Sequence, residues 1–394
     1  MLKQAVYLVG GMGTRLEDRT RHTPKPLLDV GGRPFLDYLL DEAARHGFTD
    51  ILLLAGHLGD QIEARYGMRE WRGARIRVLR EPEPLGTGGA LRFALPELAP
   101  FFLLGNGDTF FNINLRTITV RPQKNGVVMA LRADADDTRY GRVKMEGGLV
   151  RGFHPSQEAN GPINTGIVCL DRTVIQSLPA GQISLEAQFP TLAAEGYIRG
   201  ELSDGYFIDI GVPQDFERVQ RELPRQVRRP AIFFDRDGVL NEERGYVHRQ
   251  ADFSWMPGAK KAIRYCNDHG LFAFVVTNQA GVAHGHYDES AIGVLHGWVD
   301  EELARDGAHI DAYEYCPHHP AGKIARYTRT CDRRKPGPGM VRDLLAKWQI
   351  DASRSVLIGN NQSDLDAAEA AGIDGVFNDG DLLDVVKREI ARRA

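Results

Sequence analysis

Two aspartates that directly follow an apolar run form the most reactive pattern in the chain. Asp235 and Asp237 come after the run 231–234, at spacing i, i+2 beyond the end of an expected strand. Two carboxylates in this position can face one pocket, where one attacks phosphorus and the other moves a proton. A calcium loop or a polar turn would begin similarly, but Val239 and Leu240 stand where further acidic ligands would be needed.

A second reactive pattern lies near the N-terminus. The loop 10–16 contains three glycines and Arg15, and Lys25 follows between two prolines. Glycines let backbone N–H groups approach phosphate oxygens, while arginine and lysine neutralise them. The loop is not a Walker loop, since no Gly-Lys-Ser/Thr follows, and Leu16 stands where a dinucleotide fingerprint needs its third glycine. The combination predicts a phosphate-binding site of another kind.

Composition restricts the classes of protein. The 394 residues suggest two or three domains, and 49 basic against 53 acidic residues give a net charge of −4. We therefore expect small-molecule substrates and no nucleic-acid partner. No apolar run approaches the roughly 20 residues that span a bilayer, so no membrane association is expected. Four cysteines are too few for a disulfide framework, which predicts a cytoplasmic protein.

The elements that must position these residues are short strands alternating with helices. The clearest helix is 34–46, where apolar residues recur at helical spacing and Gly47 follows. The expected strands are Ala5–Val9, Ile51–Ala55, Phe101–Leu104, Val127–Leu131, Ala231–Phe234, Phe272–Thr277 and Ser355–Gly359. Such alternation predicts parallel α/β sheets. The basic segment 223–230, bracketed by prolines, predicts a linker between domains 1–222 and 231–394.

The first half resembles the sugar-1-phosphate nucleotidyltransferases, in particular the D-glycero-D-manno-heptose 1-phosphate guanylyltransferase branch. Six motifs occur in family order over residues 1 to 220. The resemblance implies a Rossmann-like, GT-A-like mixed sheet, with Arg15 and Lys25 on the triphosphate. The implied nucleotide-binding residues are Gly10, Gly11, Gly13, Thr14, Glu83, Gly86, Thr87 and Gly88. The implied sugar-binding residues are Asn164, Thr165, Gly166 and Glu186.

The same resemblance implies that Asp108 and Asp209 hold Mg²⁺. Mg²⁺ prefers carboxylates and keeps waters and phosphate oxygens in its octahedral shell, so two aspartates suit it. One departure affects the sugar. Relatives often carry a lysine on the sugar phosphate after the equivalent of Phe153, and the stretch 153–157 has none.

The second half resembles the haloacid-dehalogenase (HAD) phosphatases over about residues 230–390. Gly245-Tyr246-Val247 and the cysteine loop indicate the branch that contains D-glycero-D-manno-heptose 1,7-bisphosphate 7-phosphatase and histidinol phosphatase. The resemblance implies a parallel sheet with a minimal cap, Asp235 as nucleophile and Asp237 as acid/base. The implied phosphate-binding residues are Thr277, Asn278 and Lys335, and the implied Mg²⁺ ligands are Asp235, Asp237 and Asn360.

Two departures from this second family concern metals. Asn360 stands where relatives have a Mg²⁺-binding aspartate, so one charge is missing, although Asp364 is a candidate to replace part of it. In the cysteine loop, Cys316, His318 and Cys331 match three zinc ligands, while Arg333 replaces the fourth. A closed zinc site needs four donors, so both a structural Zn²⁺ and a metal-free loop remain open.

Together the two halves predict a bifunctional enzyme of nucleotide-activated heptose biosynthesis, as in lipopolysaccharide or capsule assembly. The C-terminal half would remove the 7-phosphate of a heptose 1,7-bisphosphate, and the N-terminal half would join the heptose 1-phosphate to a nucleotide from an NTP, preferably GTP. One alternative keeps the transferase, on another sugar 1-phosphate, beside a weak or inactive phosphatase-like half. Another gives the C-terminal half a substrate like that of histidinol phosphatase. A homodimer is the oligomeric state to test first.

Overall fold

The computed structural model describes residues 2–119, 124–133, 140–155 and 161–393. It divides into two compact units that meet in sequence between Gln226 and Val227. This division falls inside the expected linker 223–230, but the linker is shorter than expected. Helix α6 (Pro213–Gln226) includes the first four residues of the expected linker, because Leu223 is completely buried and anchors the last turn of the helix.

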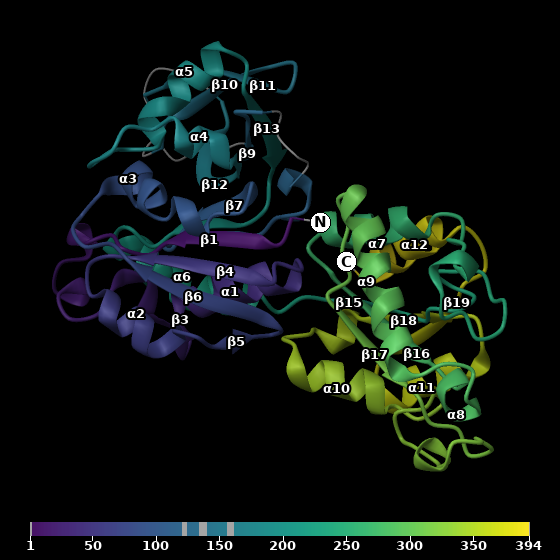
Figure 1. Cartoon of the computed structure of the whole chain (residues 1–394). Coiled ribbons are helices and arrows are strands. Elements are labelled where there is room, and N and C mark those ends of the chain that lie inside the picture. The colour runs from purple at the N-terminus through teal and green to yellow at the C-terminus, as the bar shows by residue number, and fades with distance from the viewer. Residues whose placement is uncertain (1, 120–123, 134–139, 156–160, 394) are drawn as a thin grey trace. The chain divides into compact units, whose positions relative to one another are not determined.

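The first unit is built on a mixed sheet (Figure 1). Among the described residues its strand order is β10-β11-β13-β9-β12-β7-β1-β4-β6-β5. In that order the bounds are Arg142–Glu146, Leu149–His154, Ile198–Ser203, Val127–Arg132, Ile163–Asp171, Phe101–Asn106, Gln4–Leu8, Asp50–Ala55, Ala74–Arg80 and Glu70–Trp71. The strands β7, β1, β4 and β6 run parallel, whereas β12 pairs antiparallel with β7 and β9. The predicted mixed α/β sheet is confirmed.

Two short ladders accompany this sheet. Strand β8 (Thr109–Phe111) pairs antiparallel with β14 (Phe207–Asp209), and β2 (Asp29–Val30) pairs with β3 (Arg33–Pro34). The helices of the unit besides α6 are α1 (Phe35–Arg45), α2 (Gly59–Tyr66), α3 (Gly86–Phe93), α4 (Arg172–Gln176) and α5 (Phe189–Ala194). A core between the sheet and α3, α4 and α5 includes Leu54, Leu91, Leu104, Ile175 and Phe189. On strand β1, the Tyr7 hydroxyl donates to the Leu39 carbonyl of α1.

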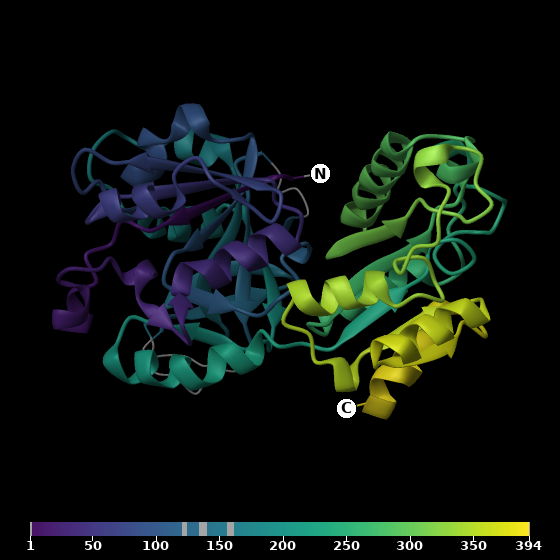
Figure 2. The ribbon, with the colours of Figure 1, turned by 90° about the horizontal axis from the view of Figure 1, so that it is seen from below.

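The second unit is an all-parallel sheet between two layers of helices (Figures 1 and 2). Its strand order is β17-β16-β15-β18-β19, with bounds Ala312–Cys316, Phe272–Asn278, Ala231–Phe234, Val356–Gly359 and Asp374–Phe377. Its helices are α7 (Ala259–Asp268), α8 (Gly281–His284), α9 (Glu289–Arg305), α10 (Gly339–Lys347), α11 (Gln362–Ala371) and α12 (Leu382–Arg393). This arrangement confirms the predicted parallel sheet.

Alternation along the strands divides the second unit's core in two. Ile232 and Phe234 of β15 face a cluster shared with α7, α9 and α12, whereas Ala231 and Phe233 face another shared with α10 and α11. Because a parallel sheet is buried on both faces, its strands read as continuous apolar runs. Because β15, β16 and β18 are parallel neighbours, their carboxyl ends meet at one edge of the sheet, and the polar motifs follow directly.

All seven strands and the helix expected from the sequence are present, with bounds that differ by no more than two residues at any end. No helix in the described part of the chain is both long and apolar enough to cross a membrane.

Candidate active sites

Asp108 and Asp209 are 101 positions apart in sequence and come together through the β8–β14 ladder. Asp209 pairs with Thr109 in that ladder, and the Ile210 N–H donates to the Asp108 carbonyl at 3.0 Å. The Gly211 N–H donates to Asp209 Oδ1 at 2.6 Å, which fixes that carboxylate. The two proposed Mg²⁺ ligands thus lie at one place, as a shared cation would require.

The ammonium of Lys25 lies between these two carboxylates. Its Nζ is 2.6 Å from Asp108 Oδ2 and 3.6 Å from Asp209 Oδ1, and the side chain is 8% exposed. Burial and the neighbouring Asp108 raise the pKa of Asp209, while Lys25 opposes that shift. A cation already held by this pair shows that the donor set suits positive charge, and so the residues present fit a hard metal ion that prefers oxygen ligands.

Arg15 reaches the same place from the glycine loop. A cavity of about 210 Å³ is lined by Arg15, Asp209, Gly211 and three neighbours, Tyr140, Val212 and Asp215. A β-carbon at Gly211 would lie 3.3 Å from both Arg15 Nη2 and Lys25 Nζ, so only a glycine leaves this space open. The loop itself turns at Gly13, whose φ of 63° suits glycine. Arg15 of the glycine loop, Lys25 and both carboxylates therefore lie together, with oxygen and nitrogen groups that could hold an anion and a cation.

Two neighbouring segments carry some of the other expected residues, namely Glu83, Gly86, Thr87 and Gly88 in one and Glu186 in the other. Thr87 on α3 donates to Glu186 Oε2 at 2.6 Å, and its oxygen accepts the Leu185 N–H. Gly88 packs against the same segment, donating its N–H to the Ile183 carbonyl. Gly86 has φ 72°, and the Glu83 side chain is exposed. The expected nucleotide and sugar segments are thus joined directly.

Strand β12 carries the other expected sugar residues. Asn164 Oδ1 accepts the Gly166 N–H, and Gly166 lies against the Asn106 amide, where a β-carbon would clash at 2.3 Å. Thr165 is buried and its hydroxyl donates to the Ala130 carbonyl, so its side chain supports the sheet. Of the lysine-free stretch 153–157, residues 156 and 157 lie outside the described part of the chain.

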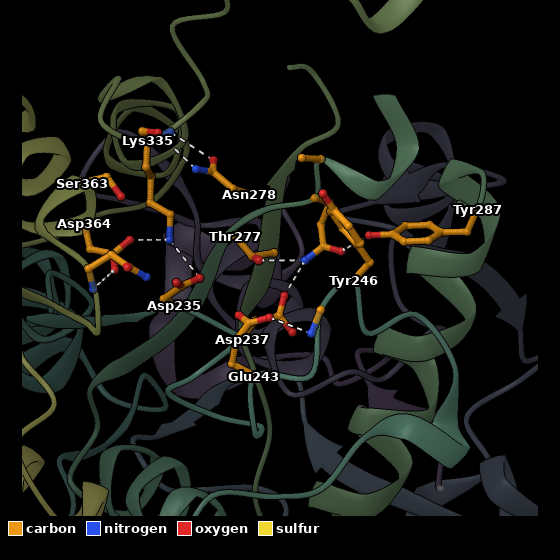
Figure 3. Close-up of a pocket in the computed structure, with 14 residues that line it drawn as sticks. Asp235, Asp237, Glu243, Tyr246, Thr277, Asn278, Tyr287, Lys335, Ser363 and Asp364 are labelled. Atoms are coloured by element: carbon orange, nitrogen blue, oxygen red, sulfur yellow. Dashed lines mark hydrogen bonds and ion pairs between the residues drawn. The ribbon is translucent and has the colours of Figure 1, made fainter. Parts of the chain in front are cut away.

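In the second unit, the buried Lys335 joins Asp235 to Asp364 (Figure 3). Lys335 Nζ is 2.8 Å from Asp235 Oδ1 and 2.7 Å from Asp364 Oδ1. Burial would lower the pKa of Lys335, but the two carboxylates outweigh it and raise that pKa. Burial, reinforced by Asp364 and opposed by Lys335, raises the pKa of Asp235 to about 6. The ammonium and the Asp235 carboxylate are therefore both ionised at pH 7.

Asp237 is held by donors that the sequence did not single out. The buried Arg236 donates to both carboxylate oxygens of Asp237, at 3.0 and 2.9 Å. Asn241 donates to Oδ1 and Gln279 donates to Oδ2. These contacts fix the Asp237 carboxylate just beyond the end of β15, in the same cavity as Asp235.

Asp235, Asp237, Thr277, Asn278 and Lys335 line one cavity of about 390 Å³, shown in Figure 3. Lys335 and Asn278 exchange two hydrogen bonds, from the Lys335 N–H to Asn278 Oδ1 and from Asn278 Nδ2 to the Lys335 carbonyl. The Thr277 hydroxyl oxygen accepts from Gln279 Nε2 at 2.9 Å. The expected nucleophile, acid/base and phosphate-binding residues therefore share a pocket.

Asn360 lies against Gly238, immediately beyond Asp237. A β-carbon at Gly238, whose φ is 84°, would meet Asn360 Nδ2 at 2.1 Å. Asn360 Oδ1 accepts from Asn361 Nδ2 at 2.9 Å. The oxygen donors of Asp235, Asp237 and Asn360 suit Mg²⁺ in kind, with an amide where the resemblance implies a carboxylate.

The suggestion that Asp364 replaces the charge missing at Asn360 is not supported. Oδ1 of Asp364 holds Lys335, and Oδ2 accepts the N–H groups of Asn360 and Asn361 at 3.1 and 3.0 Å. Asp364 thus caps α11 and anchors the lysine, because an aspartate at the third helical position reaches back to the first N–H groups.

The cysteine loop brings three metal-binding side chains together. Cys316, His318 and Cys331 each place one ligand atom within 4.8 Å of the others. Arg333, at the fourth position, pairs with Glu314 and Asp343 instead. The trio could hold a metal, but it supplies three of the four donors that a closed zinc site needs.

Arg236, Asn241, Gln279 and Glu81 are functional candidates that the sequence reasoning missed. Glu81 accepts the Leu85 N–H, and its Oε1 lies 2.6 Å from where a Gly10 β-carbon would be. A signal was present for Arg236 and Gln279, since each adjoins a residue that was singled out. Glu81 lies two residues before the motif that drew attention to Glu83.

The comparisons with known proteins agree with both families that the sequence resembles. Residues 4–226 match the family described as nucleotidyl transferase, and residues 332–380 match a HAD-hydrolase-like family. The chain belongs to the nucleotidyl transferase family, with a HAD-type phosphatase as its second unit. It therefore combines a nucleotidyltransferase with a phosphatase, as the sequence predicted.

Individual relatives cover each unit. A D-glycero-beta-D-manno-heptose-1,7-bisphosphate 7-phosphatase from Rhodopseudomonas palustris is 45% identical over 163 residues, which is 41% of this chain and 91% of the relative. One from Vibrio cholerae is 42% identical over 37% of this chain and 78% of the relative. The structure of HddC from Yersinia pseudotuberculosis is 28% identical, with a TM-score of 0.51, over 56% of this chain and all of HddC. The structure of HddC in complex with GMP-PN is 27% identical, with a TM-score of 0.50, over the same share of each chain.

A buried histidine supports the arginine that holds Asp237. His296 on α9 stacks on Tyr313 with ring centroids 4.2 Å apart, and its Nε2 lies 3.5 Å from Arg236 Nη1. Burial, followed by the charge of Arg236, lowers the pKa of His296 to about 3. Between about pH 3 and 6.5 the ring is therefore neutral in the folded state, whereas the unfolded chain would protonate it.

We predict that His296 makes the second unit less stable as the pH falls below about 6.5. The unfolded state binds a proton on His296 below its ordinary pKa and the folded state does not, so between pH 7 and pH 5 the free energy of unfolding falls by about 2 kcal/mol from this group. Urea unfolding at several pH values measures this. His296→Gln should remove that part of the pH dependence, and an unchanged slope would contradict the assignment.

Proposed function

We propose that this chain catalyses two steps of nucleotide-activated heptose synthesis. The second unit removes the 7-phosphate of a D-glycero-D-manno-heptose 1,7-bisphosphate, and the first joins the heptose 1-phosphate to GMP from GTP with release of pyrophosphate. The observation that carries this proposal is that one chain contains two separate carboxylate pairs, each around a buried lysine and each beside a cavity. The relatives of the two units support the substrates, because the product of one reaction is the acceptor of the other.

In the phosphatase unit, Oδ1 of Asp235 is already engaged by Lys335, so we assign nucleophilic attack on phosphorus to Oδ2. Asp237 gives a proton to the leaving sugar oxygen and then takes one from the water that hydrolyses the aspartyl phosphate. Lys335 and Thr277 bind the transferring phosphoryl oxygens. Asp235, the Asp237 carbonyl and Asn360 would hold Mg²⁺, which would neutralise phosphate charge.

In the transferase unit, an oxygen of the sugar phosphate attacks the α-phosphorus of the triphosphate in line, and pyrophosphate leaves. Arg15 and Lys25 neutralise the repulsion between the two anions. Asp108 and Asp209 would hold Mg²⁺, which would screen the triphosphate. When the triphosphate binds, Lys25 exchanges its carboxylate partners for phosphate oxygens. It therefore neutralises the carboxylates in the empty site and the phosphates in the occupied one.

The two activities should separate by substitution. Asp235→Asn should lower phosphate release from heptose 1,7-bisphosphate roughly 10³-fold or more, because the nucleophile is gone. Asp209→Asn should lower pyrophosphate release from GTP and heptose 1-phosphate roughly 10²-fold.

Each variant is the control for the other, since each should keep the activity of the unsubstituted unit. Loss of both activities in either variant would contradict two separate centres. Phosphate release from histidinol phosphate, and none from the heptose bisphosphate, would favour the alternative substrate.

Restoring the missing charge should strengthen the phosphatase. Asn360→Asp should lower the Mg²⁺ concentration for half-maximal phosphate release about tenfold, because a carboxylate replaces an amide oxygen. Asn361→Asp adds the same charge one residue later and is the matched control. Equal gains in both variants, or none in Asn360→Asp, would sink the assignment of position 360 as a ligand.

The choice of guanine can be tested at Glu81. Guanine presents two neighbouring N–H donors on its pairing edge, and the half-buried Glu81 carboxylate beside the glycine loop is a suitable acceptor. Glu81→Gln should reduce the ratio of kcat/KM for GTP over ATP about tenfold, measured by pyrophosphate release. Glu83→Gln, which changes the exposed carboxylate two residues on, should leave that ratio unchanged. The opposite result would assign base recognition to Glu83.

A further inference from the structure

Gln279 lies at the centre of the hydrogen bonds in the phosphatase pocket. It follows β16 directly, and its main-chain N–H donates to the Cys316 carbonyl at 2.8 Å, which fixes its backbone. The residue is only 2% exposed. A buried amide needs partners for two N–H groups and for its carbonyl oxygen, so the identity of those partners shows what the side chain can do.

Each hydrogen-bonding group of the Gln279 amide has a partner. Nε2 donates to Asp237 Oδ2 and to Thr277 Oγ1, both at 2.9 Å. Oε1 accepts from the Tyr287 hydroxyl at 2.7 Å and from Arg236 Nη2 at 3.2 Å. The opposite orientation of the amide would place its oxygen against the Asp237 carboxylate and its NH₂ group against the guanidinium. Because both of those contacts are repulsive, the amide has one stable orientation.

The Tyr287 hydroxyl supports this orientation from the wall of the pocket. Burial, opposed by the charge of Arg236, raises the pKa of Tyr287 to about 12, so the hydroxyl keeps its proton and donates it. The ring lines the cavity and stacks on His248, with ring centroids 4.5 Å apart. Figure 3 shows Tyr287 on the opposite side of the pocket from Lys335. A side chain on the wall thus reaches the phosphate-handling residues through one amide.

The contact with Gln279 determines where the Thr277 proton can go. A hydroxyl has one O–H donor, and the oxygen of Thr277 already accepts from Gln279. Within the part of the chain that the structure describes, the Thr277 hydroxyl donates to no protein atom. Thr277 lines the cavity that contains Asp235, so its proton is available to a phosphoryl oxygen bound there.

Lys335 differs from Thr277 in this respect. An ammonium has three N–H donors, and those of Lys335 contact Asp235 Oδ1, Asp364 Oδ1 and the Val276 carbonyl, at 2.8, 2.7 and 2.9 Å. A phosphoryl oxygen can bind Lys335 only when one of these acceptors is displaced, whereas the Thr277 proton has no acceptor to leave. Of these two phosphate-binding residues, Thr277 is therefore the one already prepared to donate.

We propose that Gln279 is a positioning residue for phosphoryl transfer. Its amide turns the Thr277 proton toward the phosphoryl group and holds the Asp237 carboxylate beside the leaving oxygen, while Tyr287 fixes the amide. The inference rests on the proposed function, because it assigns roles during attack by Asp235 on a sugar phosphate. In that step the bond from Asp235 Oδ2 to phosphorus forms and the bond from phosphorus to the sugar oxygen breaks. The proton of Asp237 goes to that sugar oxygen.

A comparison of two leaving groups separates positioning from a merely structural role. The full chain with Mg²⁺ is assayed on heptose 1,7-bisphosphate, whose sugar oxygen needs a proton to leave, and on p-nitrophenyl phosphate, whose phenolate leaves without one. Gln279→Met removes both N–H donors at similar volume. It should lower kcat/KM about 100-fold on the bisphosphate and about tenfold on p-nitrophenyl phosphate. Equal falls on both substrates would overturn the proposal, because a structural glutamine would affect both alike.

Three further variants complete this comparison. Tyr287→Phe keeps the ring but removes the hydroxyl, so kcat/KM should fall about tenfold on the bisphosphate and about twofold on p-nitrophenyl phosphate. Tyr265→Phe changes a tyrosine that also stacks on a histidine. Gln4→Met changes a buried glutamine of the first unit that also donates to an aspartate, Asp50. These two matched controls should keep the wild-type ratio of the two kcat/KM values, and the same shift in either would overturn the proposal.

A double-mutant cycle tests the contact between Gln279 and Thr277. The cycle uses p-nitrophenyl phosphate, whose leaving group does not need the proton of Asp237. If the amide acts through the threonine, Gln279→Met should lower kcat/KM about tenfold in the wild-type background and less than about twofold in a Thr277→Val background. Equal effects in the two backgrounds would contradict a role exerted through Thr277 and would overturn the proposal.

The outcomes distinguish this inference from the proposed function. If wild type hydrolyses p-nitrophenyl phosphate but not the bisphosphate, the proposed substrate is wrong and the double-mutant cycle still decides the inference. If wild type hydrolyses neither, both fall. If wild type hydrolyses both and Gln279→Met changes neither rate, the inference alone is wrong. Should thermal unfolding show that Gln279→Met does not fold, Tyr287→Phe decides, and an unchanged ratio of the two kcat/KM values overturns the proposal.

Discussion

Each unit depends on one buried lysine that must be matched by two carboxylates. Lys25 lies between Asp108 and Asp209, and Lys335 lies between Asp235 and Asp364. An unpaired ammonium in such a position would lose its proton or cost several kcal/mol, and removing one partner of a buried pair typically costs about 3–5 kcal/mol. Each lysine therefore holds together two carboxylates that come from separate segments of the chain. Binding of a phosphate or a cation would change the net charge of either site.

The sheets supply the rigid frame for these pairs. In the second unit, Asp235, Thr277 and Asn360 all lie at or directly after the carboxyl ends of adjacent parallel strands, so the topology alone gathers them. In the first unit, the antiparallel β8–β14 ladder performs the same task for Asp108 and Asp209. In both units, a lysine next to a proline reaches between two carboxylates. Asp108, Asp209 and Asp235 lie at strand ends, whereas Asp364 lies in the first turn of helix α11.

The sequence predicted the fold and most of the chemistry because both are encoded locally. Buried parallel strands such as 231–234 are continuous apolar runs, and the motifs that follow them have fixed spacing. Long-range partners were harder to foresee. The role of Asp364 as a helix cap and lysine partner depends on the geometry between β18 and α11, and the sequence suggested a metal-related role instead. Gln279 bridges Asp237 and Thr277 only because β15 and β16 are neighbours.

The account requires two separate phosphate centres, and a crystal structure of the full chain with GTP, Mg²⁺ and orthovanadate tests it most directly. We expect the triphosphate against Gly11, Arg15 and Lys25, with a metal ion at Asp108 and Asp209, and vanadium bonded to Asp235 beside Lys335. Nucleotide phosphates remote from Arg15, or vanadate bound away from Asp235 with no cation near either aspartate pair, would contradict it.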